Sequence, residues 1–146
     1  MSPMHHYRTI VVGTDGSPLA GPTVARAAWL AAHSDADLVI VCAYSEAPAP
    51  DAGEPPAGQV NRRSAASAAI AAAVTEAERQ SASTAVAVLV NGEPAAALLA
   101  TAEQRGADLI VVGALRVAGV AELGSVATEV ARRASCEVLV VRRPGS

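Results

Sequence analysis

Five short runs of apolar and β-branched residues recur along the chain. They cover residues 9–12, 38–41, 84–90, 109–112 and 138–141. All but the third are continuously apolar rather than alternating between apolar and polar positions, which is typical of strands covered on both faces, as in a parallel sheet. The run at 84–90 is rich in Val and stops at Asn91-Gly92, a turn signal. The pattern therefore predicts five strands in a buried sheet.

Helical signals separate the strands. Ser17-Pro18 can start a first helix, with the hydroxyl as its cap and the proline in its first turn. Residues 64–79 are so rich in Ala that propensity alone favours a second helix. Pro94 opens a third helix, which Gly106 closes, and Ser125 is expected to cap a fourth. Strands and helices thus alternate, which predicts a doubly wound α/β fold: a five-stranded parallel sheet with right-handed crossovers and helices on both faces.

One domain accounts for all 146 residues, which are enough to bury a single core. We expect residues 1–7 to form a flexible tail. Residues 46–59 hold four prolines and two glycines and are expected to form a long loop. The alternation of elements by itself permits two strand orders, 3-2-1-4-5 and 2-1-3-4-5.

The composition limits the cellular compartment and the binding partners that we expect for this protein. The chain is 51% hydrophobic but has no Phe, so its core must consist of Val, Leu, Ile and Ala. A net charge of −3 and the absence of Lys argue against nonspecific nucleic-acid binding. No apolar run approaches the ~20 residues of a membrane span, and the N-terminus lacks a signal pattern. Cys42 and Cys136 lie in apolar runs, which indicates buried, reduced thiols. We therefore expect a cytoplasmic protein that binds neither nucleic acid nor membranes.

Candidate chemistry follows the first and fourth predicted strands. The two segments are Gly13-Thr14-Asp15-Gly16-Ser17 and Gly113-Ala114-Leu115-Arg116. Each leads towards a helix N-terminus, which can bind an anion. The phosphate loop of ATPases needs a lysine that this chain lacks, and neither GxGxxG nor GxSxG occurs. A phosphoacceptor receiver domain is excluded too, since it requires a lysine after the fifth strand. Neither a catalytic set nor a metal site is evident, so we do not expect an enzyme.

Five segments in the same order resemble the universal stress protein family, and the resemblance runs over nearly the whole chain. They are residues 10–17, 92–94, 107–113, 124–134 and 136–141. The resemblance implies a Rossmann-like sheet of order 3-2-1-4-5 and a signalling role in the stress response. It also implies a symmetric homodimer that pairs through the last strand, at residues 138–141.

Family members that bind ATP or a related adenine nucleotide carry a glycine motif: Gly, two residues, Gly, nine residues, then Gly followed by Ser or Thr. The resemblance places Asp15 near the adenine or ribose, Ala43 beside the base, and Gly113, Gly124 and Ser125 around the ribose and phosphates. The full set of nucleotide-binding residues expected on this basis is Gly13, Thr14, Asp15, Ala43, Gly113, Arg116, Gly124, Ser125 and Val126.

This sequence departs from the glycine motif. Arg116 stands in place of the second glycine, and ten residues separate Gly113 from Gly124, two fewer than the motif requires. Arg116 can supply charge in place of the missing backbone contacts, or its side chain can fill the phosphate space. Purely structural roles are open as well: Asp15 satisfying turn amides, the two glycines permitting tight turns, and Ser125 capping a helix. The alternative hypothesis is a nucleotide-free homodimer of the same family that acts through partner proteins.

Overall fold

A computed structural model of the protein describes residues 7–18, 20–46, 59–82, 84–117, 120–122 and 124–142. All five strands and all four helices predicted from the sequence are present. The strands are β1 (Thr9–Gly13), β2 (Asp37–Tyr44), β3 (Gln59–Val60), β4 (Ala85–Asn91), β5 (Leu109–Gly113), β6 (Leu115–Val117), β7 (Val120–Glu122) and β8 (Glu137–Val141). The helices are α1 (Ala20–Ser34), α2 (Arg63–Arg79), α3 (Pro94–Arg105) and α4 (Gly124–Arg133).

The long strands form one parallel sheet with β1 at its centre. β1 pairs with β2 on one side and with β5 on the other. β4 pairs with β2, and β8 pairs with β5. The five long strands therefore follow the order β4-β2-β1-β5-β8, which corresponds to the expected 3-2-1-4-5. The direction of winding reverses between β1 and β5, and a crevice forms at the carboxyl ends of strands at such a point.

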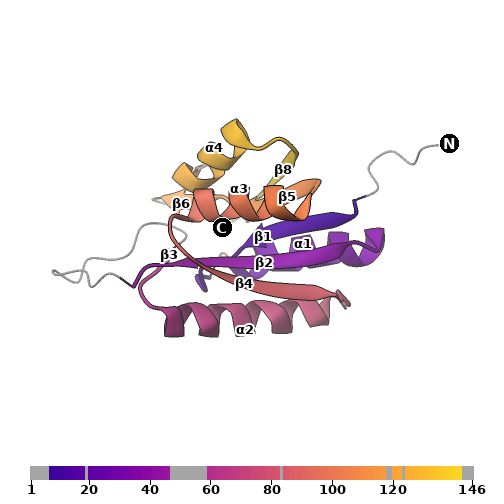
Figure 1. Cartoon of the computed structure of the whole chain (residues 1–146), viewed down its shortest axis with the longest axis horizontal. Helices are drawn as coiled ribbons and strands as arrows, with labels where there is room; N and C mark the ends of the chain where they lie inside the picture. The colour runs from indigo at the N-terminus through magenta and orange to yellow at the C-terminus, as the bar shows by residue number, and fades with distance from the viewer. Residues whose placement is uncertain are drawn as a thin grey trace.

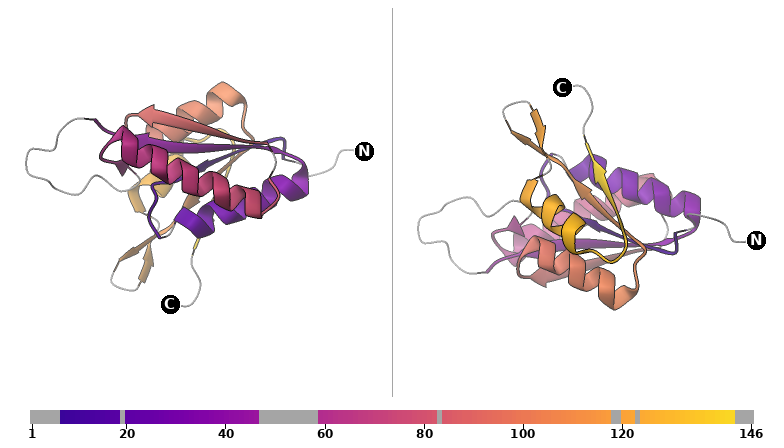
Figure 2. Two further views of the ribbon diagram at one scale, coloured as in Figure 1. Left: turned by 90° about the horizontal axis from the view of Figure 1, so that it is seen from below. Right: turned by 90° about the horizontal axis from the view of Figure 1, so that it is seen from above.

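The sheet differs from the expectation in two details. The short strand β3 pairs with Ala43 and Tyr44 at the end of β2, so the main sheet has six strands instead of five. Gln59, expected to belong to a loop, holds β3 in place because its Nε2 donates to the carbonyl oxygen of Gly92 at 2.6 Å. The second difference is the antiparallel hairpin of β6 and β7, for which the sequence had no signal. Figure 2 shows this hairpin projecting beyond the end of β5.

Helices cover both faces of the sheet (Figure 1). α1 and α2 pack on one face, and α3 and α4 pack on the other. Ile10, Val11 and Val12 of β1 are all 0% exposed, because consecutive side chains of a strand point to opposite faces and both faces are covered. The helices present many alanines to the sheet, and these small side chains let helix and sheet approach closely. The unbroken apolar runs of the sequence are thus explained by burial on both sides.

Two glycines mark helix ends. α3 begins at Pro94 and is followed by Gly106, whose φ of +63° suits glycine, as predicted. α4 begins at Gly124 itself, which has a φ of +79°. Ser125 therefore lies within the first turn of α4 and does not precede the helix, so the interpretation of Ser125 as its cap is wrong.

The ends of the described segments correct two further expectations. Tyr7 belongs to the folded structure and not to a flexible tail, because its hydroxyl donates to Glu137 Oε1 at 2.8 Å and its side chain packs against the core. Residues 1–6 and 47–58, which make up the rest of the expected tail and most of the expected loop, lie outside the described residues. None of the helices in the described segments is long and apolar enough to cross a membrane.

Outside the cleft, the two cysteines lie only partly as the sequence suggested. Cys42 and Cys136 are free thiols, but only Cys42 is fully buried.

Arg63 is exposed and lies over the ring of Tyr44, with its guanidinium carbon 5.7 Å from the ring centroid. Its Nη1 also donates to the Tyr44 hydroxyl at 3.0 Å. These contacts tie the start of α2 to the carboxyl end of β2.

Candidate functional site

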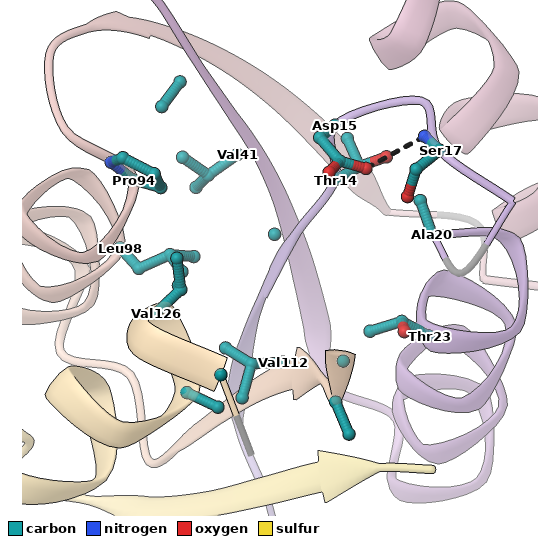
Figure 3. Close-up of a pocket in the computed structure, with 16 residues that line it drawn as sticks. Thr14, Asp15, Ser17, Ala20, Thr23, Val41, Pro94, Leu98, Val112 and Val126 are labelled. Atoms are coloured by element: carbon teal, nitrogen blue, oxygen red, sulfur yellow. Dashed lines mark hydrogen bonds between the residues drawn. The ribbon is translucent and has the colours of Figure 1, made fainter. Parts of the chain in front are cut away.

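A cleft with a volume of about 110 Å³ lies at the carboxyl ends of β1, β2 and β5, where the winding of the sheet reverses (Figure 3). The turn after β1 and three helices complete its walls. The described residues that line it are Gly13, Thr14, Asp15, Ser17, Ala20, Thr23, Val41, Ala43, Pro94, Leu98, Val112, Gly113, Ala114, Gly124, Val126 and Ala127.

One wall of the cleft is polar and is formed by the turn after β1 and by α1. The backbone N–H of Thr14 donates to the carbonyl of Val41 at 2.9 Å, which joins this turn to β2. Asp15 Oδ1 accepts from the backbone N–H of Ser17 at 2.9 Å. This bond is the structural role that Asp residues often have in turns, and it fixes the carboxylate at the edge of the cleft. Thr23, from α1, adds a hydroxyl to the same wall.

The opposite wall is apolar. Figure 3 shows Pro94, Leu98 and Val126 from α3 and α4 on the side of the cleft away from Asp15. Val41, from β2, lies on the same side. The cleft is therefore amphipathic across its width, with hydroxyl and carboxylate groups facing aliphatic side chains. Such a pocket suits a ligand with one flat, weakly polar part and one part rich in hydroxyl groups.

Both strand-end glycines lie close to side chains of the helices that cover the sheet. A Cβ added at Gly113 would lie 2.6 Å from Thr23 Oγ1, closer than real Cβ atoms come. A Cβ added at Gly13 would lie 3.3 Å from both terminal carbons of Leu98. Gly113 thus lets α1 approach β5, and Gly13 lets α3 approach β1. The role of Gly113 seen here is close packing and not the tight turn that the sequence suggested, because Gly113 does not have a positive φ.

The start of α4 contributes backbone as well as side chains to the cleft. Gly124, Val126 and Ala127 line the cavity, while Ser125 is exposed and is not among the described lining residues. Backbone N–H groups in the first turn of a helix have no partner within the helix, and the helix dipole places about half a positive charge there. This end of the cleft therefore attracts an anion.

Charge is scarce within the cleft. Among the described lining residues, Asp15 alone carries a formal charge. Burial, and to a smaller extent the negative charge of Asp15, raises the pKa of the Cys42 thiol to about 11. Cys42 packs on the opposite face of β2 from Val41 and Ala43, with the core beneath α1 and α2. Its thiol stays neutral and is not part of the site.

The structure brings most of the predicted residues together. Seven of the nine line the cleft: Gly13, Thr14, Asp15, Ala43, Gly113, Gly124 and Val126. Ser125 does not. The backbone of Arg116 lies in β6, and its side chain lies outside the described part of the structure.

Sequence reasoning missed the residues that the helices contribute to the cleft. Ala20 and Thr23 come from α1, and Pro94 and Leu98 come from α3. No sequence signal identified them as cleft residues, because a helix bordering a cleft and a helix bordering the core have the same pattern. Ser17 belonged to the candidate segment after the first strand, and the structure places it in the cleft as well.

Comparisons with known proteins agree with these observations. The family model described as "Universal stress protein family" matches residues 6–142. A universal stress protein of Mycobacterium tuberculosis is 35% identical over 144 residues, which cover 94% of this chain and 98% of that protein. A universal stress protein of Thermus aquaticus is 37% identical over 143 residues, which cover 93% and 99%. The crystal structure of a universal stress protein in complex with cAMP matches with a TM-score of 0.72 and 35% identity, covering 93% of this chain and 97% of that one. The chain therefore belongs to the universal stress protein family.

Proposed function

We propose that this protein binds an adenine nucleotide in the cleft and acts as a nucleotide-responsive signalling module of the stress response in the cytoplasm. One observation carries the proposal. Seven residues expected from the family motif, scattered from Gly13 to Val126 in the sequence, meet in one cleft at the switch point of the sheet. The relative crystallised with cAMP supports the choice of ligand class, since it is 35% identical to this chain over almost its whole length.

The two walls suggest how the nucleotide lies. The apolar wall, with Ala43 at its strand end, suits the face of an adenine base. Asp15 can accept hydrogen bonds from ribose hydroxyl groups on the polar wall. The backbone N–H groups of Gly124, Ser125 and Val126 can then hold a phosphate at the start of α4. Arg116, which follows Gly113 on β6, is proposed to add positive charge beside this phosphate.

We propose a binding role and not a catalytic one. Among the described lining residues, those with polar side chains are Asp15 and three hydroxyl residues, Thr14, Ser17 and Thr23. His33 stacks on Trp29 with ring centroids 3.9 Å apart, on the outer face of α1, where it has no access to the cleft. A hydroxyl nucleophile with an adjacent base is the usual requirement for hydrolytic chemistry, and the described lining residues do not supply that pair.

We also propose that two copies of the chain associate through β8. Of the five long strands, β8 is last on its side of the sheet. Val138, Leu139, Val140 and Val141 are all partly exposed, and the strand contains no Pro. An unpaired apolar edge of this kind favours pairing with another strand.

Mass spectrometry of natively purified protein tests the nucleotide proposal, with co-purifying adenine nucleotide as the expected result. Titration calorimetry on Gly124→Leu adds a matched comparison, because a bulky side chain at the start of α4 should block the approach of phosphate. Gly106→Leu is the control: this glycine also has a positive φ at a helix end, and a Cβ there meets nothing within 4 Å. If the wild type binds none of AMP, cAMP, ADP and ATP at millimolar concentration, the nucleotide proposal is wrong and the nucleotide-free homodimer stands.

A further inference from the structure

We infer that the cleft selects adenine nucleotides with a single phosphate, as the 5′-monophosphate or the 3′,5′-cyclic monophosphate, over the triphosphate. The inference rests on the proposed function and specifies its ligand class. It comes from the segment between Gly113 and Gly124, which departs from the family motif and folds as a hairpin.

The hairpin cannot form a cradle for additional phosphates. β6 and β7 pair in antiparallel register, with Leu115 opposite Glu122, Arg116 opposite Ala121 and Val117 opposite Val120. A phosphate cradle needs consecutive N–H groups that converge on one point. Consecutive N–H groups of an extended strand point to opposite sides instead. Six of the ten residues between the two glycines are therefore in a conformation that cannot surround a phosphate.

Other backbone donors near the strand ends already have partners. The N–H of Ala114, directly after Gly113, donates to the carbonyl of Val141 at 2.9 Å. The N–H of Thr14 donates to Val41, and that of Ser17 donates to Asp15. The first turns of α1 and α3 also border the cleft, but Pro22 and Pro94 have no N–H, and the N–H of Ala20 donates to Ser17 at 3.0 Å. The start of α4 contains no proline and is therefore the richest group of backbone donors along the described walls, and one helix N-terminus holds one phosphate well.

The charges around the cleft also favour a ligand with a single phosphate. A phosphate monoester carries about 1.5–2 negative charges at neutral pH, and each further phosphoryl group adds more. Against this charge the cleft offers the dipoles of α1, α3 and α4, which all begin at it and are each worth about half a positive charge, and the proposed contact of Arg116. No cationic side chain is present among the described lining residues, and Asp15 repels phosphate from the opposite wall. A triphosphate therefore leaves more of its charge unneutralised than a monophosphate does.

Titration calorimetry of the full-length protein with AMP, cAMP, ADP and ATP tests the inference. We expect AMP or cAMP to bind at least tenfold more tightly than ATP, with ADP in between, and the comparison of AMP with cAMP identifies the form preferred. ATP is measured both with and without Mg²⁺, since the cation removes part of its charge. Binding of either form of ATP as tight as that of the better monophosphate overturns the inference and leaves the proposed function intact. Absence of binding by all four nucleotides refutes the proposed function itself.

A variant that restores the family spacing provides the second test. It combines Arg116→Gly with the insertion of two glycines after residue 118, so that the pattern of two and nine intervening residues is recovered. The ratio of ATP affinity to AMP affinity should rise at least tenfold. The control carries Arg116→Gly alone and should leave the ratio below that of the restored variant, because the segment remains two residues short. An unchanged ratio in a restored variant with native circular dichroism overturns the inference. If that variant does not fold, the ranking of nucleotides by the wild type decides.

Discussion

Replacing Gly113 by alanine tests whether this glycine serves the packing of β5 against α1. The new Cβ would lie 2.6 Å from Thr23 Oγ1. Thr23 is 3% exposed, so either its side chain or α1 must shift within a packed environment to admit the new Cβ. Overpacking of this kind costs about 1–3 kcal/mol. For a domain of this size such a loss lowers the melting temperature by about 3–10 °C.

A double-mutant cycle isolates the contact. Thr23→Ala removes the atom that Gly113→Ala would meet, so the double variant should be destabilised less than the sum of the two single changes, by a coupling of about 0.5–3 kcal/mol. Urea denaturation followed by circular dichroism measures all four proteins. Gly21→Ala is the control, because Gly21 also lies in α1 but a Cβ there meets nothing within 4 Å. This control should keep or raise the stability of the wild type.

Additive effects of Gly113→Ala and Thr23→Ala would refute the packing argument. So would a Gly113→Ala protein that unfolds like the wild type but no longer binds nucleotide, because the glycine would then serve the ligand alone. Under the packing argument, any loss of binding in Gly113→Ala accompanies the loss of stability, and both recover in the double variant.

Three further predictions concern charge, assembly and pH. Arg116→Ala should weaken the binding of AMP relative to that of adenosine by ~1.5–3 kcal/mol in titration calorimetry, because it removes a charge-assisted bond to phosphate. Tighter binding of AMP by this variant would mean that the arginine fills the site. Sedimentation at micromolar concentration should give the mass of two chains for the wild type and of one for Val140→Asp, which places like charges across the paired β8 edges; a monomeric wild type contradicts the dimer. The raised pKa of Cys42, about 11 against an ordinary 9.0, stabilises the fold below pH 9. This contribution to the free energy of unfolding is lost as the pH rises from about 9 to 11, because the thiol of the unfolded chain ionises first. Urea denaturation should show a smaller loss of stability over this range in Cys42→Ala than in the wild type, and equal losses would contradict the argument.

Several features of the fold were determined by local sequence patterns. Strands buried on both faces must be apolar throughout, so the runs around Val11 and Val111 could be recognised without knowing their neighbours. The ends of α3 followed from Pro94 and Gly106, whose backbone preferences act within one turn of helix. The strand order did not follow from periodicity, which allowed two arrangements. It came from the resemblance to a family.

The candidate site could be predicted in part for the same reason. Gly13, Asp15 and Gly113 follow strands, and parallel strands bring their carboxyl ends to one edge, so these residues could be placed together. Ser125 was misplaced because a shift of one residue in the start of α4 separates a cap from a residue of the first turn. The short strand β3 and the β6–β7 hairpin carry too few residues for a periodic signal.

The sequence by itself determined the long strands, the helices, the two-faced burial of the sheet and the edge at which the candidate residues gather, because these depend on side-chain polarity over a few neighbouring residues. Only the tertiary structure decided that Gly113 is held against Thr23, that Leu98 forms the apolar wall, and that the segment carrying Arg116 is a hairpin. Each of these features depends on a contact or a strand pairing, and the local sequence pattern does not specify which residues are the partners. The character of the cleft, amphipathic across its width and poor in positive charge, arises from those contacts.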